Sequence, residues 1–253
     1  MIKQSEIKNL SRRYKVPIST IERDYTQSWL LRFLPEMIFK GGTCLRKVYF
    51  KDYRFSDDLD FTLLEETTIA DLEEKILNAI RQAKTESNIE FMDEINSDEV
   101  KNGYSFDIYF RITRVTGSPI KIKLDITRNK NEHIINQIAQ KVINHPYSDK
   151  VDSKVLAYSL DEIFAEKTRS LFERTRPRDV YDVWYLSKHL NFDISLFRKK
   201  CEFKRLEPDI EELTNRKTKF ENAWEVSLRH QLPGLPSATD VFDGVIRFLK
   251  KML

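Results

Sequence analysis

Apolar side chains recur at helical spacing in the first 35 residues. They form two stripes: Ile7, Leu10 and Tyr14, then Tyr25, Trp29 and Phe33. Residues three or four apart share one side of a helix, so each stripe predicts a helix with one buried face. Because proline interrupts helices, we expect Pro17 to separate the two helices and Pro35 to end the second. The short apolar stretch 37–39 follows.

Three later segments alternate apolar and polar residues, as strands with one buried face do. They are residues 56–63, 105–112 and 120–127. The Thr-Gly-Ser-Pro sequence at 116–119 predicts a hairpin turn between the last two. Between the first and second segments, an amphipathic helix is predicted from apolar residues at helical spacing: Leu72, Ile76, Ala79, Ile80 and Ala83.

From about residue 133 onward, apolar residues recur at helical spacing almost throughout. The first stripe is Ile134, Ile138 and Val142. A Ser-Leu-Asp-Glu capping box at 159–162 opens another helix, and further helices are predicted over 179–190 and 240–249. The pattern predicts an α+β protein with two domains. They are a mixed core with N-terminal helices over residues 1–130 and a helical subdomain over 131–253.

The composition of the 253-residue chain excludes several classes of protein. A hydrophobic fraction of 40% is enough for a sizeable core and rules out wholesale disorder. No apolar run approaches the roughly 20 residues of a membrane span, and the polar start shows no secretory signal. Cys44 and Cys201 are too few and too far apart for a disulfide scaffold or a cysteine-rich zinc site. We expect a soluble, cytoplasmic protein.

Charge is distributed unevenly, although the net charge is only +3. Acids predominate over residues 57–99, whereas bases predominate over 166–205 and in the first 34 residues. One surface could therefore hold metal while another meets polyanions. The alternative is that these charges lie on solvated helix faces.

Two acids stand two residues apart on the polar side of the first predicted strand, Asp58 and Asp60. Like charges on one strand face repel each other, and Asp is unfavourable in strands. Two carboxylates placed this way can bridge a pair of divalent cations about 3.5–4 Å apart. Mg²⁺ suits the role because it binds through one or two carboxylates and substrate phosphates. The alternative is an exposed edge strand with acids there by chance.

Asp125 lies on the polar face of the strand predicted over 120–127. If that strand neighbours the Asp58 strand, three carboxylates converge, and the third could hold a metal or orient an attacking hydroxyl. The alternatives are an ion pair with Lys121 or Lys123, or simple exposure.

Gly41, Gly42 and Thr43 form a complementary turn. Paired glycines let the backbone approach a ligand closely, and Thr43 is a suitable N-cap for the helix that follows. Backbone N–H groups at such a helix start bind phosphate. Alone, the two glycines are also compatible with an ordinary turn. Their combination with three acids on later strands is more specific.

These residues resemble a known family. Residues 40–45 (Lys-Gly-Gly-Thr-Cys-Leu) and 54–61 (Arg-Phe-Ser-Asp-Asp-Leu-Asp-Phe) resemble the first motif of the AbiEii/AbiGii-type nucleotidyltransferases. That family is similar to the toxins of type IV abortive-infection systems and to the MenT toxins. Its first motif is a variant of the DNA-polymerase-β-like nucleotidyltransferase signature.

Three further segments resemble the later motifs of the family. Residues 123–125 stand where the second motif lies, Asp161 with 167–171 looks like the third, and 176–182 looks like the fourth. The sequence departs from the family pattern mildly, with Cys44, Ser170 and Arg178 in place of a small residue, Ala and Lys.

The resemblance implies a polymerase-β-like core with a small mixed or antiparallel sheet, followed by a helical subdomain. It also implies Mg²⁺-dependent transfer of NMP from an NTP to an acceptor hydroxyl, with a tRNA or other RNA 3′ end as the acceptor and an antitoxin as the partner. The implied catalytic residues are Asp58, Asp60, Asp125 and Lys167, the first three of which would hold metal. The implied nucleotide-binding residues are Gly41, Gly42, Thr43, Ser56, Lys167, Arg178, Asp179 and Asp182.

Other interpretations remain open at this point. A same-fold enzyme could modify a protein hydroxyl, and a non-catalytic nucleic-acid-binding module could use the N-terminal helices. Lys167 could be an ordinary solvated lysine, and residues 176–179 a capped helix start with a surface ion pair. The four histidines are scattered and give no metal-ligand pair at helical spacing.

Overall fold

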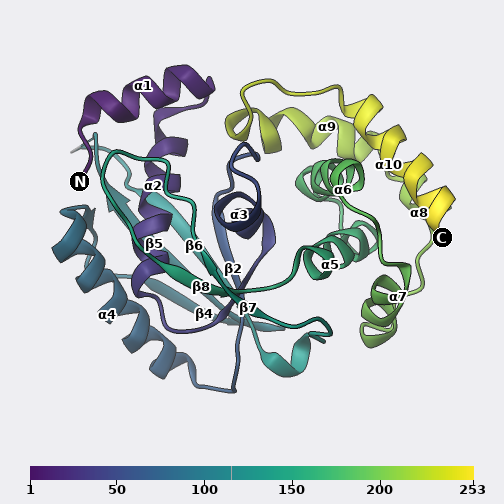
Figure 1. The fold of residues 1–253 in the computed structure, drawn as a ribbon, viewed down its shortest axis with the longest axis horizontal. Helices are drawn as coiled ribbons and strands as arrows, with labels where there is room; N and C mark the ends of the chain where they lie inside the picture. The colour runs from purple at the N-terminus through teal and green to yellow at the C-terminus, as the bar shows by residue number, and fades with distance from the viewer. Residues whose placement is uncertain (115) are drawn as a thin grey trace. The chain divides into compact units, whose positions relative to one another are not determined.

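The computed structural model of the chain describes residues 1–114 and 116–253, and its ribbon is drawn in Figure 1. The chain divides into two compact units. The first unit comprises residues 1–132 and 138–158, and the second comprises residues 133–137 and 159–253. The chain therefore enters the second unit, returns to the first after residue 137, and leaves it again after residue 158.

The first unit contains the strands and the N-terminal helices. Its helices are α1 (Gln4–Tyr14), α2 (Ile18–Phe33), α3 (Gly41–Cys44) and α4 (Ile69–Ser87), with the π-helix η1 (Leu45–Tyr49) and the 3-10 helix η2 (Asn129–Asn131). Its strands are β1 (Ile38–Lys40), β2 (Asp58–Thr62), β3 (Glu90–Phe91), β4 (Asn96–Val100), β5 (Gly103–Arg111), β6 (Ile120–Thr127), β7 (Ala139–Val142) and β8 (Lys154–Ala157). The predicted N-terminal helices, amphipathic helix and three strands are all confirmed.

The strands form one mixed sheet. Within the described residues it has eight strands in the order β3–β5–β6–β2–β1–β8–β7, and β4 also pairs with β5. Strand β2 lies between β6, to which it is parallel, and β1, to which it is antiparallel. Strands β5 and β6 form the predicted antiparallel hairpin. This mixed sheet with its helices confirms the α+β fold class.

Alternation along the strands separates a core face from a polar face. The buried side chains of β2, β5 and β6 include Leu59, Phe61, Phe106, Ile108, Phe110, Ile122, Leu124 and Ile126. Helix α2 contacts both α4 and β6, and all five apolar residues predicted for α4 are buried. The residues between the buried ones on β2 and β6 therefore belong to the opposite, polar face.

The helix predicted from Ile134 to Val142 is wrong. Residues 139–142 form β7, which pairs antiparallel with β8, and β8 runs parallel to β1. None of the three apolar residues of the predicted stripe is buried, and Val142 is 60% exposed. Their spacing of four residues therefore reflects no packed helix face. Strand pairing with β8 sets the conformation instead.

The second unit is helical apart from residues 133–137. Its helices are α5 (Leu160–Glu173), α6 (Pro177–His189), α7 (Ile194–Phe203), α8 (Ile210–Asn215), α9 (Lys217–Leu228) and α10 (Ala238–Met252), with the 3-10 helix η3 (Arg229–Gln231). In the described part of the chain, no helix combines the length and apolar character that crossing a bilayer requires.

The predicted capping box is half formed, and its acid serves another contact. The Ser159 hydroxyl accepts a hydrogen bond from the Glu162 backbone N–H, as an N-cap does. The Glu162 carboxylate does not return to Ser159. It accepts from the backbone N–H groups of Ile135 (3.2 Å) and Asn136 (3.0 Å) and pairs with the buried Lys200 ammonium. This carboxylate therefore ties residues 133–137 to the helices of the second unit.

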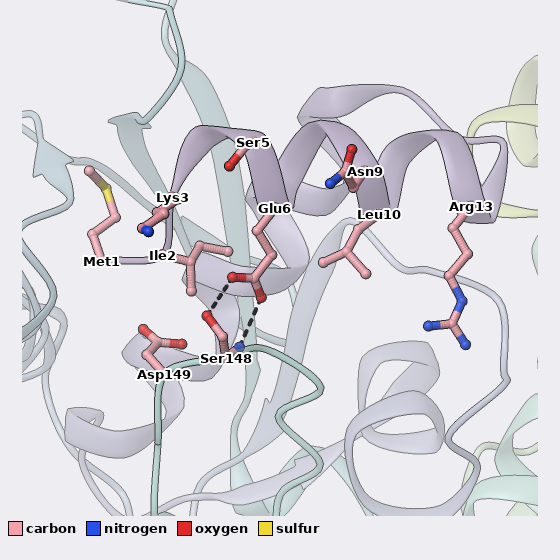
Figure 2. A pocket seen from close by; sticks show the side chains of 10 residues that line it. All are labelled: Met1, Ile2, Lys3, Ser5, Glu6, Asn9, Leu10, Arg13, Ser148 and Asp149. Carbon is pink, nitrogen blue, oxygen red and sulfur yellow. Dashed lines mark hydrogen bonds between the residues drawn. The ribbon is translucent and has the colours of Figure 1, made fainter.

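A pocket of about 630 Å³ opens beside α1 in the first unit (Figure 2). Its two acids already have partners. Glu6 accepts hydrogen bonds from the backbone N–H and the hydroxyl of Ser148, and Asp149 accepts one from the Tyr25 hydroxyl at 2.6 Å. None of the site residues predicted from the sequence lines this pocket.

Candidate active site

Asp58, Asp60 and Asp125 lie on the polar face of the sheet in the first unit. Leu59, between the first two, is buried in the core. Strand β2 runs parallel to β6, and Asp60 is the register partner of Asp125. Neighbouring strands lie about 4.8 Å apart and register partners point the same way. The strand pairing on which the predicted convergence depended is therefore present.

Asp125 also makes an ion pair that the sequence offered as an alternative. Lys123 Nζ lies 2.7 Å from Asp125 Oδ1, and the two side chains are 39% and 36% exposed. An exposed pair contributes only about 0–1 kcal/mol, so a divalent cation can displace this lysine.

The donor set of the polar face limits how a metal can bind. Within residues 1–114 and 116–253, no group of three or more His, Cys, Asp and Glu side chains is arranged to hold a metal ion. Asp58 and Asp60 are hard oxygen donors on one strand face. They fit a cation such as Mg²⁺, which takes one or two carboxylates and completes its shell with phosphate oxygens and water.

The two glycines make room for the functional side chains around them. Gly41 has a φ of +78°, and a Cβ atom there would lie 2.1 Å from Asp60 Oδ2. A Cβ atom at Gly42 would lie 2.7 Å from Arg54 Nη2 and 3.0 Å from Ser56 Oγ. The turn therefore brings its backbone against the Asp60 carboxylate, the Arg54 guanidinium and the Ser56 hydroxyl, an approach that only glycine allows.

Thr43 is not the helix N-cap that the sequence predicted. Helix α3 begins at Gly41, and Lys40 occupies the N-cap position without a side-chain capping bond. Because the helix begins three residues earlier than expected, Thr43 lies inside α3. Its buried hydroxyl donates a hydrogen bond to the backbone carbonyl of Asp58. Thr43 thus fixes the glycine turn to the first residue of β2.

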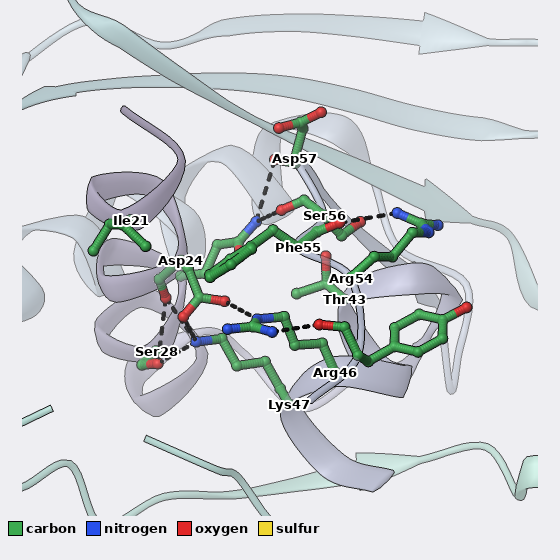
Figure 3. A network of polar contacts seen from close by, with 12 residues as sticks. Ile21, Asp24, Ser28, Thr43, Arg46, Lys47, Arg54, Phe55, Ser56 and Asp57 are labelled. Atoms are coloured by element: carbon green, nitrogen blue, oxygen red, sulfur yellow. Dashed lines mark hydrogen bonds and ion pairs between the residues drawn. The ribbon is translucent and has the colours of Figure 1, made fainter. Parts of the chain in front are cut away.

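A buried polar network joins the segment that follows the glycine turn to helix α2 (Figure 3). Asp24 of α2 accepts a hydrogen bond from Arg46 Nε at 2.7 Å and one from Lys47 Nζ at 2.8 Å. Lys47 Nζ also donates to the Asp24 carbonyl and to Ser28 Oγ, and the Tyr147 hydroxyl donates to Asp24 Oδ2 at 2.7 Å. The network therefore fastens η1, which continues directly from the glycine turn, to helix α2.

The same helix holds the segment that leads into β2. Gln27 Nε2 donates to the backbone carbonyls of Ser56 (3.1 Å) and Asp57 (3.2 Å), and Arg23 pairs with the Asp57 carboxylate at 2.7 Å. Arg46 Nη1 donates to the Tyr53 carbonyl. Ser56 and Asp58 are consequently positioned by α2, whose own residues lie outside the predicted site.

Burial and neighbouring charge set the ionisation of this network. Burial alone would raise the pKa of Asp24, but the adjacent Arg46 and Lys47 charges outweigh it and hold that pKa well below its usual value. Burial lowers the pKa of Lys47 to about 8, despite the attraction of Asp24. Burial, followed by the charge of Asp60, raises the pKa of Cys44 and keeps it a thiol.

Two predicted site residues of the second unit, Asp179 and Asp182, contact a third, Lys167. Its ammonium lies 2.9 Å from Asp179 Oδ1 and 2.8 Å from Asp182 Oδ2, and both aspartates are almost fully buried. Arg174 Nε lies 2.8 Å from Asp179 Oδ2. Burial would raise the pKa of Asp179, but Lys167 and Arg174 together lower it well below the usual value.

This cluster decides two alternatives left open by the sequence. Lys167 is 12% exposed and bridges two carboxylates, so it is not an ordinary solvated lysine. Pro177 occupies the first turn of α6, as expected for a helix start, and Arg178 on the same helix is partly exposed. The Arg174–Asp179 ion pair at this start involves a buried carboxylate and is not a surface pair.

The Asp24 network is the part of the site that sequence reasoning missed. The sequence pattern that could have predicted this network is the presence of charged residues inside otherwise apolar segments. Asp24 precedes the buried Tyr25 in α2, and Arg46 and Lys47 lie between Leu45 and Val48. Charges that are buried at such positions must be paired, because an unpaired buried charge is costly.

Comparison with known proteins identifies the family. A family model described as "Nucleotidyl transferase AbiEii toxin, Type IV TA system" matches residues 28–247. The chain belongs to this family. It is therefore a nucleotidyltransferase toxin of a type IV toxin–antitoxin system, an enzyme that takes an NTP and has an antitoxin as its partner. This confirms the resemblance drawn from the motifs.

Solved structures of low sequence identity share the fold. The AbiEii-family chain is similar to MenT4, a nucleotidyltransferase toxin from Mycobacterium tuberculosis H37Rv, with a TM-score of 0.63 and 15% identity over 98% of this chain and 88% of that one. It is also similar to JHP933 from Helicobacter pylori, with a TM-score of 0.61 and 18% identity over 94% of each chain. A search of curated proteins gave no match.

Proposed function

We propose that this AbiEii-family enzyme transfers NMP from an NTP to the 3′ hydroxyl of an RNA, such as a tRNA, in a Mg²⁺-dependent reaction. The observation that carries the proposal is the approach of the Gly41 backbone to the Asp60 carboxylate, on the strand face shared by Asp58 and Asp125. A turn that can accept a triphosphate thus lies beside the carboxylates that can hold its metal.

Asp58 and Asp60 would hold Mg²⁺, with Asp125 as the base. When bound, the metal would lower the pKa of the acceptor hydroxyl and stabilise charge on the phosphate oxygens. Asp60 is held in place because its side chain fills the space that a Cβ atom at Gly41 would take. Asp58 is held because Thr43 bonds its carbonyl.

The residues around Gly42 would hold the triphosphate. The Ser56 hydroxyl and the Arg54 guanidinium lie against the backbone there, on the side where another residue would carry a Cβ atom. A guanidinium offers paired N–H donors that match phosphate oxygens. Thr43 would act mainly by fixing the turn, since its hydroxyl is already bonded to β2.

In the second unit, Lys167 would bind a phosphate. Lys167 is held by Asp179 and Asp182 in one fixed position, which lowers the entropic cost of binding a phosphate. Arg178, one residue before Asp179, is partly exposed and can add a second cation.

The proposed reaction exchanges one phosphoryl bond for another. The acceptor hydroxyl oxygen attacks the α-phosphorus of the NTP and forms a new P–O ester bond. The bond between the α-phosphorus and the bridging oxygen breaks, and pyrophosphate leaves with the electron pair. The hydroxyl proton passes to Asp125, whose present partner, Lys123, is exposed and displaceable.

The test uses the full chain with each of the four NTPs labelled at the α-phosphate, together with bulk tRNA and Mg²⁺. Label is expected to enter RNA with the wild type. Asp60→Ala should reduce incorporation to background while leaving the circular dichroism spectrum unchanged. The matched control is Asp98→Ala, which removes an exposed acid from β4 and should transfer label like the wild type.

Three outcomes would overturn the proposal. Label that enters protein and not RNA would point to a side-chain hydroxyl as the acceptor. Undiminished incorporation by a folded Asp60→Ala variant, or incorporation that survives EDTA, would remove the metal role assigned to this strand face.

A further inference from the structure

Helix α6 carries an aromatic and basic face, of which the proposed function uses only Arg178. At 100° per residue, Arg178, Tyr181, Tyr185, Lys188 and His189 fall on one arc of about 100° along the helix. Of these five side chains, all but Tyr181 are partly or fully exposed. We call this set the α6 row.

The rings of the α6 row are nearly parallel and one helical turn apart. The Tyr185 and His189 ring centroids lie 4.2 Å apart with an interplanar angle of 18°, and the Tyr181 and Tyr185 centroids lie 6.3 Å apart at 25°. His189 Nδ1 lies 2.7 Å from the Tyr185 carbonyl, which fixes the orientation of the imidazole. The result is a column of flat rings whose last member, His189, reaches solvent.

The outward charge of this helix face is positive. The two acids of α6, Asp179 and Asp182, are buried and neutralised by Lys167 and Arg174. The α6 row itself contains cations and no acid. Lys188 Nζ lies 3.4 Å from the Trp184 ring centroid, so its charge is held close to the helix surface.

We infer that the α6 row binds an unpaired stretch of a polynucleotide, a base of which extends the ring column by stacking on the exposed His189, which Tyr185 supports, while its phosphates meet the row's cations. Flat side chains interleaved with cations are the features by which proteins hold single strands, since every base has a face to stack and every linkage a charge. A duplex keeps its bases inside and offers nothing to stack. The inference rests on the proposed function, in which the acceptor is an RNA end.

The test measures binding without NTP, so that it does not depend on transfer. The probe is a fluorescein-labelled single-stranded RNA of about 12 nucleotides, read by fluorescence polarisation and compared with the same strand annealed to its complement. Tyr185→Ala should weaken single-strand binding about five-fold or more, whereas Tyr185→Phe, which keeps the ring, should bind like the wild type. His189→Ala, a change at an exposed position, gives an independent second variant if Tyr185→Ala does not fold.

A matched control distinguishes the row from any exposed ring beside a cation. Phe203 on α7 is 41% exposed, and Lys204 Nζ lies 5.5 Å from its ring centroid. Phe203→Ala should leave single-strand binding within about two-fold of the wild type, because the neighbouring ring, His133, is tilted by 46° and forms no parallel stack with it.

The inference is overturned if the duplex binds as tightly as the single strand, or if Tyr185→Ala and His189→Ala both bind like the wild type. It is also overturned if a mononucleotide displaces the labelled strand at the same concentration as the unlabelled strand does. The binding assay and the transfer assay separate this inference from the proposed reaction. A wild type that binds the strand through Tyr185 but transfers no label would refute only the reaction, and active transfer with unchanged binding in both variants would refute only the α6 row.

Discussion

Replacing Asp24 by alanine would remove a carboxylate that lies between two buried cations. Arg46 and Lys47, which are 3% and 1% exposed, would lose their ionic partner, and the Tyr147 hydroxyl would lose its acceptor. Removing one member of a buried ion pair costs about 3–5 kcal/mol. For a chain of this length, that loss lowers the melting temperature by roughly 6–20 °C.

The size of the loss can be checked against an exposed pair. In the Lys84–Asp93 pair the atoms are 3.5 Å apart, and the side chains are 49% and 96% exposed. Asp93→Ala should therefore cost less than about 1 kcal/mol. Urea unfolding followed by tryptophan fluorescence at pH 7 gives both values on the same scale.

A double variant tests whether the loss arises from stranded charge. Lys47→Met leaves Asp24 paired with Arg46, so the loss caused by Asp24→Ala should be smaller in this background by about 0.5–3 kcal/mol. Strict additivity of the two changes, or an Asp24→Ala loss no larger than that of Asp93→Ala, would refute the assigned role of the network.

Two further predictions concern the glycine turn and acid stability. Gly41→Ala should lower NMP transfer about 10- to 100-fold by displacing Asp60. Gly117 has a φ of +87° but open space around it, so Gly117→Ala should affect only stability, and Gly234→Ala should be neutral. Equal transfer activity of the three variants would contradict the steric argument. Burial lowers the pKa of His145 below 6.5. Below that pH the unfolded chain therefore binds the proton more readily than the folded chain, and the free energy of unfolding falls as pH falls, by at most about 1.4 kcal/mol per pH unit. Urea midpoints measured at pH 7.5 and 5.5 should differ less in His145→Gln than in the wild type.

The elements with regular alternation were predictable from the sequence. Strand β6 has the bounds that its pattern indicated, 120–127. Isoleucine or leucine at every second position means that only one face of the strand can be the buried one. Helix α4 was predictable for the equivalent reason at helical spacing. The same period of two put Asp58 and Asp60 on one strand face.

Other features depended on partners distant in the chain. Strands β7 and β8 carry little alternation and exist because they extend a sheet edge, which no local pattern shows. The parallel pairing of β2 with β6 joins residues far apart in sequence, so the neighbourhood of Asp60 and Asp125 could only be expected from the family resemblance. The contacts of Lys167 with two buried aspartates likewise depend on how α5 and α6 pack.

The excursion of residues 133–137 into the second unit has a practical consequence for dissecting the protein. A fragment starting at Ser159 would lack the backbone amides that Glu162 accepts from and the His133 carbonyl that Lys200 donates to. During synthesis, these five residues also leave the ribosome before the helices against which they pack. Neither unit is one continuous stretch of chain, and a cut at 158 would leave the buried Glu162 and Lys200 each without one of their hydrogen-bond partners.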